Sequence, residues 1–363
     1  MSQRKPELLL PAGNVDSFYA ALEGGADAVY LGLRNFNARG RASNFSESYL
    51  LAAVQEARKR KVKLYVTLNT VIKNTEIDSL LDVLSFLEKA RVDAIIVQDW
   101  GVYHLARRWF PKLTIHASTQ MGNHNSAGVS FSAEKGIARV ILARELTMKE
   151  LEGIAAKAKT ELELFIHGAL CYSFSGMCFF SSYIGGRGAN RGLCAQPCRM
   201  VYKDGDQQKY LFSLKDNQQL ANLEKLIALG IHSLKVEGRM KPADYVYRVA
   251  KAYSLAIDHP EKHQEAEELL SLDFGREKTS YFMGKDVGNS LAESSNTGIP
   301  LGFVQQVRQS EVIFETETGL VEGDRIRIRN VRNESTFNLR LQDLKAEGNR
   351  YSFTIESQET VHV

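Results

Sequence analysis

The chain has 363 residues, of which 44% are hydrophobic, 25% charged and 9% aromatic, and its formal net charge is +3. This composition is that of a folded globular protein of about two domains, and it excludes a disordered chain. The near balance of charge indicates no particular partner. No run approaches the roughly 20 apolar residues of a membrane span, and the N-terminal apolar stretch is too short for a secretion signal, so we expect a cytoplasmic protein.

Short apolar runs alternate with amphipathic segments through the first 240 residues, and such runs are typical of parallel strands buried on both faces. The predicted strands are Glu7–Leu10, Ala28–Leu31, Lys63–Thr67, Ala94–Val97, Leu113–Ala117, Arg139–Leu142, Glu163–Ile166 and Ser233–Val236. Between them, Ser46–Lys61 and Ile77–Ala90 have helical periodicity, with Ser46 and then Asn74 or Thr75 as expected N-caps. Eight strand–helix repeats predict an α/β fold, a TIM-like (β/α)8 barrel. The competing doubly wound sheet would carry a glycine-rich phosphate loop after the first strand, and none is present there.

The pattern changes after the predicted barrel, which we place at residues 1–240. Residues 241–290 are expected to form a helical linker region. Residues 291–363 alternate polar and apolar positions between turn signals, which predicts a small antiparallel, β-barrel-like domain. Its expected strands are Gly298–Arg308, Glu311–Glu317, Asp324–Ile328 and Tyr351–Ile355. The last residues give no stop signal, so the sequence leaves open that the chain belongs to a longer protein.

Active sites of such barrels lie at the carboxyl ends of the strands, and polar residues follow seven of the predicted strands. We expect His116, His167 and Glu237 to act as acid–base groups, with both histidines reaching into the barrel mouth. A metal held by the histidines is the alternative, although no third ligand stands at zinc-like spacing. The predicted substrate-binding residues are Asn69, Gln98, Gln120, Arg144 and Arg239.

The two arginines of this set suit a carboxylate or phosphate ligand, because a guanidinium group can donate two parallel hydrogen bonds. Arg144 is predicted to follow the sixth strand and Arg239 the eighth. The competing interpretation is a pair of structural ion pairs, Arg144 with Glu145 and Arg239 with Glu237.

All four cysteines of the chain lie within 28 residues, in a long insertion after the seventh predicted strand. They are Cys171, Cys178, Cys194 and Cys198. In a reducing compartment such a group indicates a metal or redox site before it indicates disulfides. The spacing lacks the two tight CxxC pairs of a zinc ribbon and contains glycine-rich intervals, which favours a [4Fe–4S] cluster. A four-thiolate zinc site and two disulfides or free thiols are the alternatives.

The residues around the first two cysteines resemble a known signature. Gly168-Ala169-Leu170-Cys171, four further residues and Gly176-x-Cys178 are similar to the pattern of the collagenase-like peptidase U-32 family. Phe180 departs from this pattern, since an aliphatic residue is usual there. Further blocks agree: Leu8–Gly13, Gly25–Tyr30, His116–Gln120, Ala189–Cys194 and Lys235–Lys241. The resemblance covers about residues 5–245, with a weaker echo in the C-terminal β domain.

The resemblance implies two kinds of activity. The family is named for proteolysis, but several members are hydroxylation factors whose cysteines ligate a [4Fe–4S] cluster. Bacterial branches make 5-hydroxyuridine in tRNA or 5-hydroxycytidine in 23S rRNA in a process linked to prephenate, an anionic co-substrate that Arg144 and Arg239 would then hold. The four cysteines here match the cluster ligands of these members. A metal-dependent peptidase and an iron–sulfur scaffold for another hydroxylase are the alternatives.

The residues themselves favour RNA hydroxylation over proteolysis. Neither a GxSxG elbow nor an HExxH motif occurs in the chain. RNA binding requires basic groups close to the site, and we expect Arg39, Arg187 and Arg191 to contact RNA. The run Arg58–Lys61 is instead expected to be the solvated end of a helix, where cations suit the helix dipole.

Overall fold

The computed structural model describes residues 5–40, 42–205, 207–273, 275–284, 290–291, 301–308, 310–329 and 336–355. The chain divides into two compact units, Met1–Gly298 and Ile299–Val363. None of the described helices is long and apolar enough to cross a membrane.

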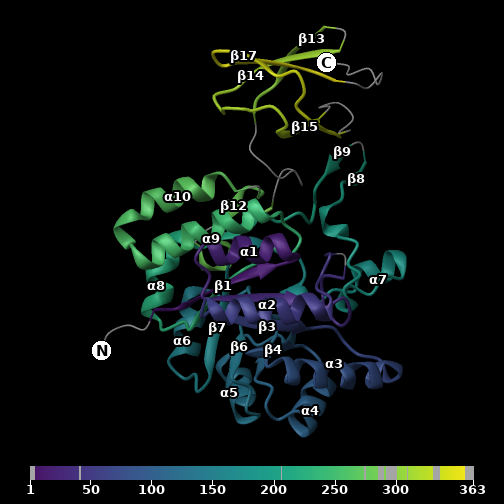
Figure 1. Cartoon of the computed structure of the whole chain (residues 1–363), viewed down its shortest axis with the longest axis vertical. Coiled ribbons are helices and arrows are strands. Elements are labelled where there is room, and N and C mark those ends of the chain that lie inside the picture. The colour runs from purple at the N-terminus through teal and green to yellow at the C-terminus, as the bar shows by residue number, and fades with distance from the viewer. Residues whose placement is uncertain are drawn as a thin grey trace. The chain divides into compact units, whose positions relative to one another are not determined.

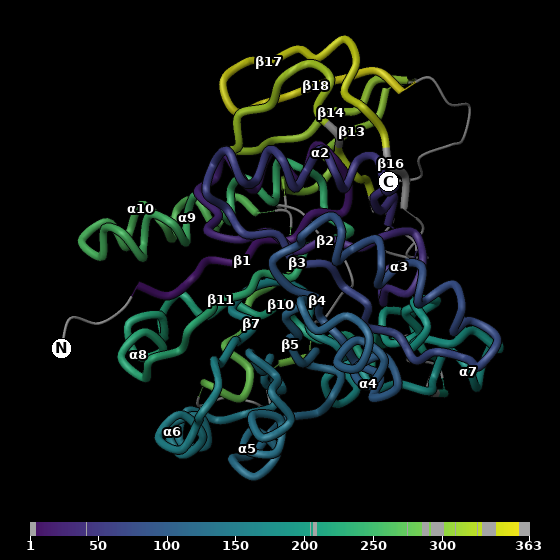
Figure 2. Tube along the Cα trace, turned by 60° about the horizontal axis from the view of Figure 1, so that its bottom comes forward, coloured from purple at the N-terminus to yellow at the C-terminus, as the bar shows by residue number. Residues whose placement is uncertain are grey.

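Eight parallel strands close into a barrel in the first unit, so the predicted α/β barrel is confirmed (Figures 1 and 2). Neighbouring strands pair in chain order, and the last strand closes the ring because it pairs with both the first and the seventh. The strands are β1 (Glu7–Ala12), β2 (Ala28–Gly32), β3 (Lys63–Leu68), β4 (Ala94–Val97), β5 (Ile115–Ala117), β6 (Arg139–Ile141), β7 (Glu161–Ala169) and β11 (Ser233–Val236). All eight coincide with the predicted apolar runs.

A helix follows each barrel strand. These helices are α1 (Val15–Glu23), α2 (Glu47–Lys59), α3 (Ile77–Ala90), α4 (Trp100–Trp109), α5 (Ser126–Glu134), α6 (Met148–Ala155), α8 (Leu223–Ala228) and α9 (Ala243–Asp258). The Ser46 side chain caps α2, as predicted, by accepting a hydrogen bond from the Tyr49 N–H. The predicted cap of α3 is wrong, because Asn74–Glu76 form a separate 3-10 turn before it and Glu76 stands at the N-cap without a capping bond.

Side chains alternate along the strands between the barrel interior and the surrounding helices. The apolar interior residues are Leu9, Ala28, Tyr30, Tyr65, Ala94, Ile96, Ile141 and Phe165. The alternate residues, such as Leu8, Leu10 and Val66, pack with the helices in the main core. Burial on both faces explains why the strands are nearly continuous apolar runs in the sequence.

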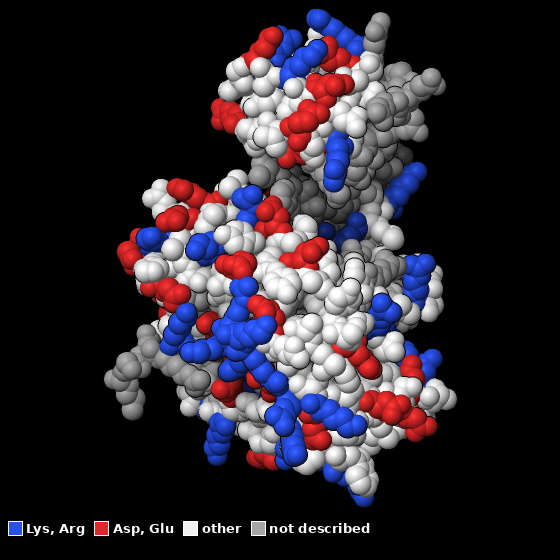
Figure 3. All heavy atoms as spheres, viewed as in Figure 1, with Lys and Arg blue, Asp and Glu red and all other residues white. Residues whose placement is uncertain are grey.

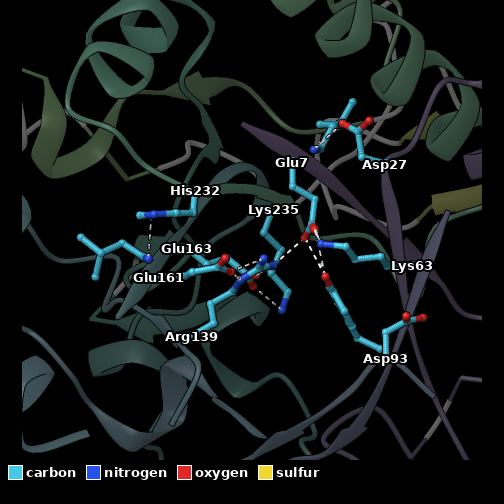
Figure 4. A network of polar contacts seen from close by, with 12 residues as sticks. Glu7, Asp27, Lys63, Asp93, Arg139, Glu161, Glu163, His232 and Lys235 are labelled. Atoms are coloured by element: carbon cyan, nitrogen blue, oxygen red, sulfur yellow. Dashed lines mark hydrogen bonds and ion pairs between the residues drawn. The ribbon is translucent and has the colours of Figure 1, made fainter. Parts of the chain in front are cut away.

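Charged side chains meet where the strands begin (Figure 4). We call this group the barrel floor: Glu7, Lys63, Arg139, Glu161, Glu163 and Lys235. Arg139 is 3% exposed and donates hydrogen bonds to Glu7, Glu161 and Glu163. Lys235 donates to the other oxygen of Glu163 at 3.0 Å, and Lys63 bonds Glu7 at 2.9 Å. Three carboxylates thus face three cations, so the floor is electrically balanced.

Two glycines let the chain approach itself closely at the other end of the barrel. A Cβ atom on Gly13, just after β1, would lie 1.8 Å from the Arg239 carbonyl oxygen. Gly168 in β7 has a φ of +104°, and a Cβ there would lie 2.3 Å from the Glu237 carbonyl oxygen. Only glycine fits at both positions, which ties two blocks of the resemblance to the segment Glu237–Arg239.

A long insertion separates β7 from α8 and contains the four cysteines, as predicted. It comprises four 3-10 turns, η3 (Phe174–Gly176), η4 (Ala189–Arg191), η5 (Pro197–Arg199) and η6 (Leu220–Asn222), the short helix α7 (Phe180–Gly185), and the strands β8 (Tyr202–Asp204), β9 (Gln207–Lys209) and β10 (Asp216–Gln218). β10 pairs antiparallel with β7 and parallel with β12 (Lys278–Thr279). The insertion is therefore anchored to the barrel sheet at both ends.

The residues after β11 are largely helical. α9 packs against α1 and β1 and is the eighth helix of the barrel, while α10 (His263–Ser271) packs against α9. A 3-10 turn, η7 (Pro260–Lys262), joins these two helices, and another, η8 (Tyr281–Met283), follows β12.

The second unit contains antiparallel strands, as predicted. β13 (Val304–Arg308), β14 (Glu311–Glu315), β18 (Arg350–Thr354) and β17 (Lys345–Glu347) form one sheet in that order, and β15 (Arg325–Arg329) pairs with β16 (Thr336–Arg340). Val312, Phe314, Leu341, Tyr351 and Phe353 are its buried core. The start of the predicted strand Gly298–Arg308 and the chain end Gln358–Val363 lie outside the described residues.

Candidate functional site

Glu237 lies at the mouth of the barrel, directly after β11. Arg39, from the loop after β2, donates to its Oε1 through Nε at 3.2 Å and Nη2 at 3.1 Å. The Tyr30 hydroxyl lies 3.4 Å from Oε2 and donates to the Val236 carbonyl at 2.9 Å. Burial alone would raise the pKa of Glu237, but the positive charges of Arg39, Arg239 and Arg144 lower it below its usual range. Glu237 is therefore a carboxylate that faces three arginines.

Among the described residues, Arg144 forms no ion pair with Glu145 and Arg239 forms none with Glu237, so the alternative interpretation of these two arginines does not hold. Arg239 is 4% exposed and donates through Nη1 to Thr67 at 2.9 Å and to Asn37 at 3.3 Å. Burial lowers its pKa to about 10. Arg144 donates weakly to the Ala169 carbonyl at 3.4 Å. Among the described residues, the Nε groups of both arginines are buried without a hydrogen-bond partner.

The mouth has more positive than negative charge. The three arginines Arg39, Arg144 and Arg239 outnumber the carboxylates Glu237 and Glu145. Ser175 donates to Glu145 through its N–H at 2.8 Å and its hydroxyl at 2.6 Å. A buried N–H group without a hydrogen-bond partner destabilises the folded protein. A ligand that accepts hydrogen bonds from both Nε groups would remove this penalty, which favours its binding. The arrangement can hold an anion.

Amide side chains line the mouth beside Arg239. The Asn69 Nδ2 donates to Gln120 Oε1 at 3.1 Å, and its Oδ1 accepts from the Ala38 N–H. The Oε1 atom of Gln98, after β4, is buried without a partner among the described residues. Of the three predicted amide side chains, Asn69 and Gln120 therefore hydrogen-bond each other, and Gln98 has a carbonyl oxygen available to accept a hydrogen bond.

His116 lies inside the barrel rather than at its mouth. In the strand register it stands opposite Ile96 and Arg139, and its ring meets the Tyr65 ring edge at 4.8 Å between centroids. Burial, reinforced by the charge of Arg139, holds the pKa of His116 well below 6.5. His116 is a neutral imidazole beside the barrel floor and has no direct access to the mouth. Its catalytic role stays a prediction.

His167 points away from the mouth, so the expectation that both histidines reach into it is wrong. Its Nε2 lies 2.6 Å from Asp273 Oδ2, and its Nδ1 lies 3.3 Å from the hydroxyl of Tyr253 on α9. The register of β11 against β7 shifts at this point, which turns the side chain outward. Lys278 also binds Asp273, and the pKa of Asp273 falls to about 2 although burial opposes this. No signal in the sequence marked Asp273 as the partner.

The cysteine segment has backbone donors beside three of its sulfurs. The Phe180 N–H donates to Cys178 at 3.4 Å, the Gln196 N–H donates to Cys194 at 3.3 Å, and the backbone of Tyr172 bonds Cys198. All four thiols are partly exposed. Among the described residues, no group of three or more His, Cys, Asp or Glu side chains is placed to hold a single metal ion.

Cys198 lies beside Arg199, a basic residue of the same segment. Burial raises the pKa of Cys198, Arg199 lowers it, and the charges of Cys171 and Cys194 raise it again. Arg199 donates to the Leu170 and Leu214 carbonyls and to the Ser213 hydroxyl. Arg39 at the mouth has a raised pKa chiefly because of Glu237, with Tyr30 and, last, Cys171 contributing less.

The three predicted RNA-contacting arginines differ in what they bind. Arg39 is occupied by Glu237. Arg191 donates to both oxygens of Glu76, at 2.5 and 3.0 Å, and to the Val71 carbonyl, so it fastens the cysteine segment to the loop after β3. Arg187 is exposed, and its side chain has no partner among the described residues. Of the three, Arg187 alone has its guanidinium group available.

Basic side chains also gather around the end of α2 (Figure 3). Arg58 donates there to the Ala90 and Arg91 carbonyls at the end of α3, and Arg60 pairs with Glu23 and Glu56. These contacts confirm the prediction that this run ends a helix, and they lie at the barrel end opposite the mouth.

The family model of peptidase family U32 matches residues 13–293. The chain belongs to peptidase family U32. It is 39% identical to the tRNA hydroxylation protein P1 of Bacillus subtilis (strain 168), over 70% of this chain and 64% of that protein. It is 34% identical to the 23S rRNA 5-hydroxycytidine C2501 synthase of Escherichia coli (strain K12), over 90% of this chain and 53% of that protein. It is also 34% identical to the collagenase of Porphyromonas gingivalis (strain ATCC BAA-308 / W83), over 69% of this chain and 65% of that protein.

The U32 match extends from the loop after β1 to the residues beyond η8, so it includes the mouth and all four cysteines. The recognised family is thereby confirmed. The chain spans between about half and two thirds of the length of these relatives.

Proposed function

We propose that this U32 protein takes part in the hydroxylation of an RNA nucleobase, 5-hydroxyuridine in tRNA or 5-hydroxycytidine in 23S rRNA. The observation that carries the proposal is the position of the cysteine segment, which begins at Cys171, two residues after the carboxyl end of β7, at the mouth end of the barrel. Relatives named for tRNA and rRNA modification support the choice of substrate.

The donor set fits a [4Fe–4S] cluster. Four thiols within one insertion satisfy its ligand count, and N–H groups aimed at the sulfurs stabilise thiolates bound to iron. A cluster takes one thiolate at each of four irons, which is the number of cysteines in the insertion. When bound, the cluster would supply one-electron chemistry.

The mouth fits an anionic co-substrate such as prephenate. Arg144 and Arg239 have unpartnered Nε donors, and the surplus positive charge would stabilise a carboxylate. Glu237 remains the proposed proton acceptor there, and the three arginines that hold it ionised also make it a weak base. Arg39 fixes the position of Glu237 through two hydrogen bonds, and the Tyr30 hydroxyl lies 3.4 Å from its other oxygen.

Mass spectrometry of nucleosides from tRNA and rRNA of a deletion strain tests the proposal. We expect one 5-hydroxylated pyrimidine to disappear and to return with the parent gene but not with Cys178→Ala. An unchanged nucleoside profile would overturn the proposal. Hydroxylation of the missing base by the anaerobically purified protein with prephenate would identify an enzyme, whereas restoration only in cells would indicate a scaffold for another hydroxylase.

A peptidase is the second candidate, since a relative at 34% identity is named collagenase. Cleavage of gelatin by the purified full chain, lost in Glu237→Gln, would support it. A deletion strain with normal RNA and a purified protein that cleaves gelatin would together replace hydroxylation as the function.

A further inference from the structure

The cysteine segment has an unusual composition for an exposed surface. Residues 171–202 contain six aromatic residues and three arginines but no Asp or Glu. The remainder of the chain balances its charges closely, so this segment is a local exception. A surface that combines aromatic rings with cations and lacks carboxylates is typical of a nucleic-acid contact.

Five of the six aromatic residues of the segment fall into two sets, and the sixth, Phe174, packs edge-on against His124. Phe180 and Tyr202 turn inward and pack around Phe212 together with Tyr172, which is 51% exposed, with ring centroids 5.0 to 6.3 Å apart. The second set, Phe179 and Tyr183, is 76% and 90% exposed. The inward set already forms the packing of the segment, so the outward rings are not needed for it.

The two outward rings belong to one helical turn. The Tyr183 N–H donates to the Phe179 carbonyl at 2.9 Å, so the two residues are four positions apart and share a side of α7. α7 stands at the periphery of its unit (Figures 1 and 2). Arg187 follows two residues after α7, and its N–H donates to the Ser181 carbonyl, which folds it back onto the helix.

The arginines of the segment also divide. Arg191 is neutralised by Glu76, and Arg199 is turned inward onto backbone carbonyls. Arg187 is exposed and has no side-chain partner among the described residues. One cation therefore accompanies the two exposed rings, without a carboxylate in the segment to neutralise it.

We propose that Phe179, Tyr183 and Arg187 form a docking face for an unpaired stretch of RNA. Bases stack on the two rings, and Arg187 contacts a phosphate. The inference rests on the proposed function, since it names how the RNA substrate is held beside the mouth. Stacking on exposed rings requires bases with free faces, which duplex RNA does not offer. The face thus selects a loop or a single strand.

Binding of the full chain to a fluorescently labelled single-stranded RNA, measured by anisotropy, tests the docking face. Loss of one stacked base weakens binding about ten-fold, so Phe179→Ala with Tyr183→Ala should raise Kd by at least that factor. The conservative pair Phe179→Tyr with Tyr183→Phe should keep the parental Kd. Tyr49→Ala removes a ring that is 59% exposed on α2 and should change nothing. Arg187→Gln should reduce the salt dependence of binding.

Two outcomes would overturn the inference: parental affinity in the double alanine variant, or equal affinity of the parent for the same strand annealed to its complement. Unchanged circular dichroism and iron content establish that the variant is folded. The nucleoside profile of the deletion strain separates this inference from the proposed function. Parental RNA binding by the double variant, together with a missing hydroxylated base in the deletion strain, rejects the docking face and leaves hydroxylation standing.

Discussion

Arg139→Met is expected to destabilise the first unit strongly, because it removes one cation from the balanced barrel floor. Arg139 donates to Glu7, Glu161 and Glu163. Glu161 reaches solvent, Glu163 is buried and the Glu7 side chain is only 10% exposed. Breaking a buried ion pair by removing one partner typically costs about 3–5 kcal/mol. Methionine fills most of the space of the aliphatic part of the arginine side chain, so it leaves a smaller cavity than alanine would.

The structure also sets how this loss depends on pH. In the parent, burial opposes ionisation of Glu7, but Arg139 and Lys63 hold its pKa below 4.5, so it is ionised in both the folded and the unfolded state above about pH 5. Without Arg139 the buried carboxyl is expected to take up a proton on folding. At pH 7 this costs about 3.4 kcal/mol, at about 1.36 kcal/mol for each pH unit above 4.5. The difference between parent and variant should therefore shrink by about 1.4 kcal/mol per unit as the pH falls from 7 to 5.

Equilibrium urea unfolding, followed by circular dichroism at pH 5, 6 and 7, measures both quantities. Arg60→Met is the matched control, since Arg60 also binds two carboxylates but is exposed, and it should unfold like the parent. Arg139→Lys, which keeps the charge, should fall between parent and Arg139→Met. A difference that does not vary with pH would refute the reasoning, because a simple loss of packing has no titrating group.

Four further outcomes are expected. Anaerobically purified parent should contain about four iron and four sulfide per chain, and alanine at any one of the four cysteines should remove the brown colour; a colourless parent with one zinc would contradict this. Arg144→Lys or Arg239→Lys should abolish hydroxylation in cells while iron content stays parental, because lysine cannot donate two parallel hydrogen bonds to one carboxylate as a guanidinium group does. Arg199→Gln should lower the midpoint potential of the cluster, measured by anaerobic titration, since a positive charge beside the thiolates is lost; an unchanged potential would place Arg199 outside the cluster's field. Asp273→Asn should lower the thermal midpoint without changing iron content, as it leaves Lys278 and His167 without their carboxylate.

The barrel was predictable because its strands are buried on both faces, so their apolar runs are visible in the sequence without any partner. The alternation is clear enough that all eight runs coincide with the observed strands. The pairing of β10 with β7 and β12 was not predictable in the same way. Asp216–Gln218 and Lys278–Thr279 are polar, and their strand conformation depends on tertiary pairing to a buried neighbour.

The residues of the mouth were predictable as positions but not as contacts. Their location follows from the rule that strand ends converge, whereas their partners depend on loops whose paths the sequence does not specify. Arg39 forms the ion pair with Glu237, and Arg239 instead donates hydrogen bonds to Thr67 and Asn37. His167 illustrates the same limit, because a shift in register of one strand turns it from the mouth towards α9.

The two ends of the barrel use the same residue types for opposite purposes. At the floor each cation has a carboxylate, so the charges cancel and no ligand is required. At the mouth three arginines outnumber the carboxylates Glu237 and Glu145, and two of the arginines keep an unpartnered Nε among the described residues. Buried donors without acceptors reduce stability, so a fold would not retain them for its own sake. An anion that accepted hydrogen bonds from these donors would recover this free energy. For this reason the proposed co-substrate is to be sought at the mouth rather than at the more heavily charged floor.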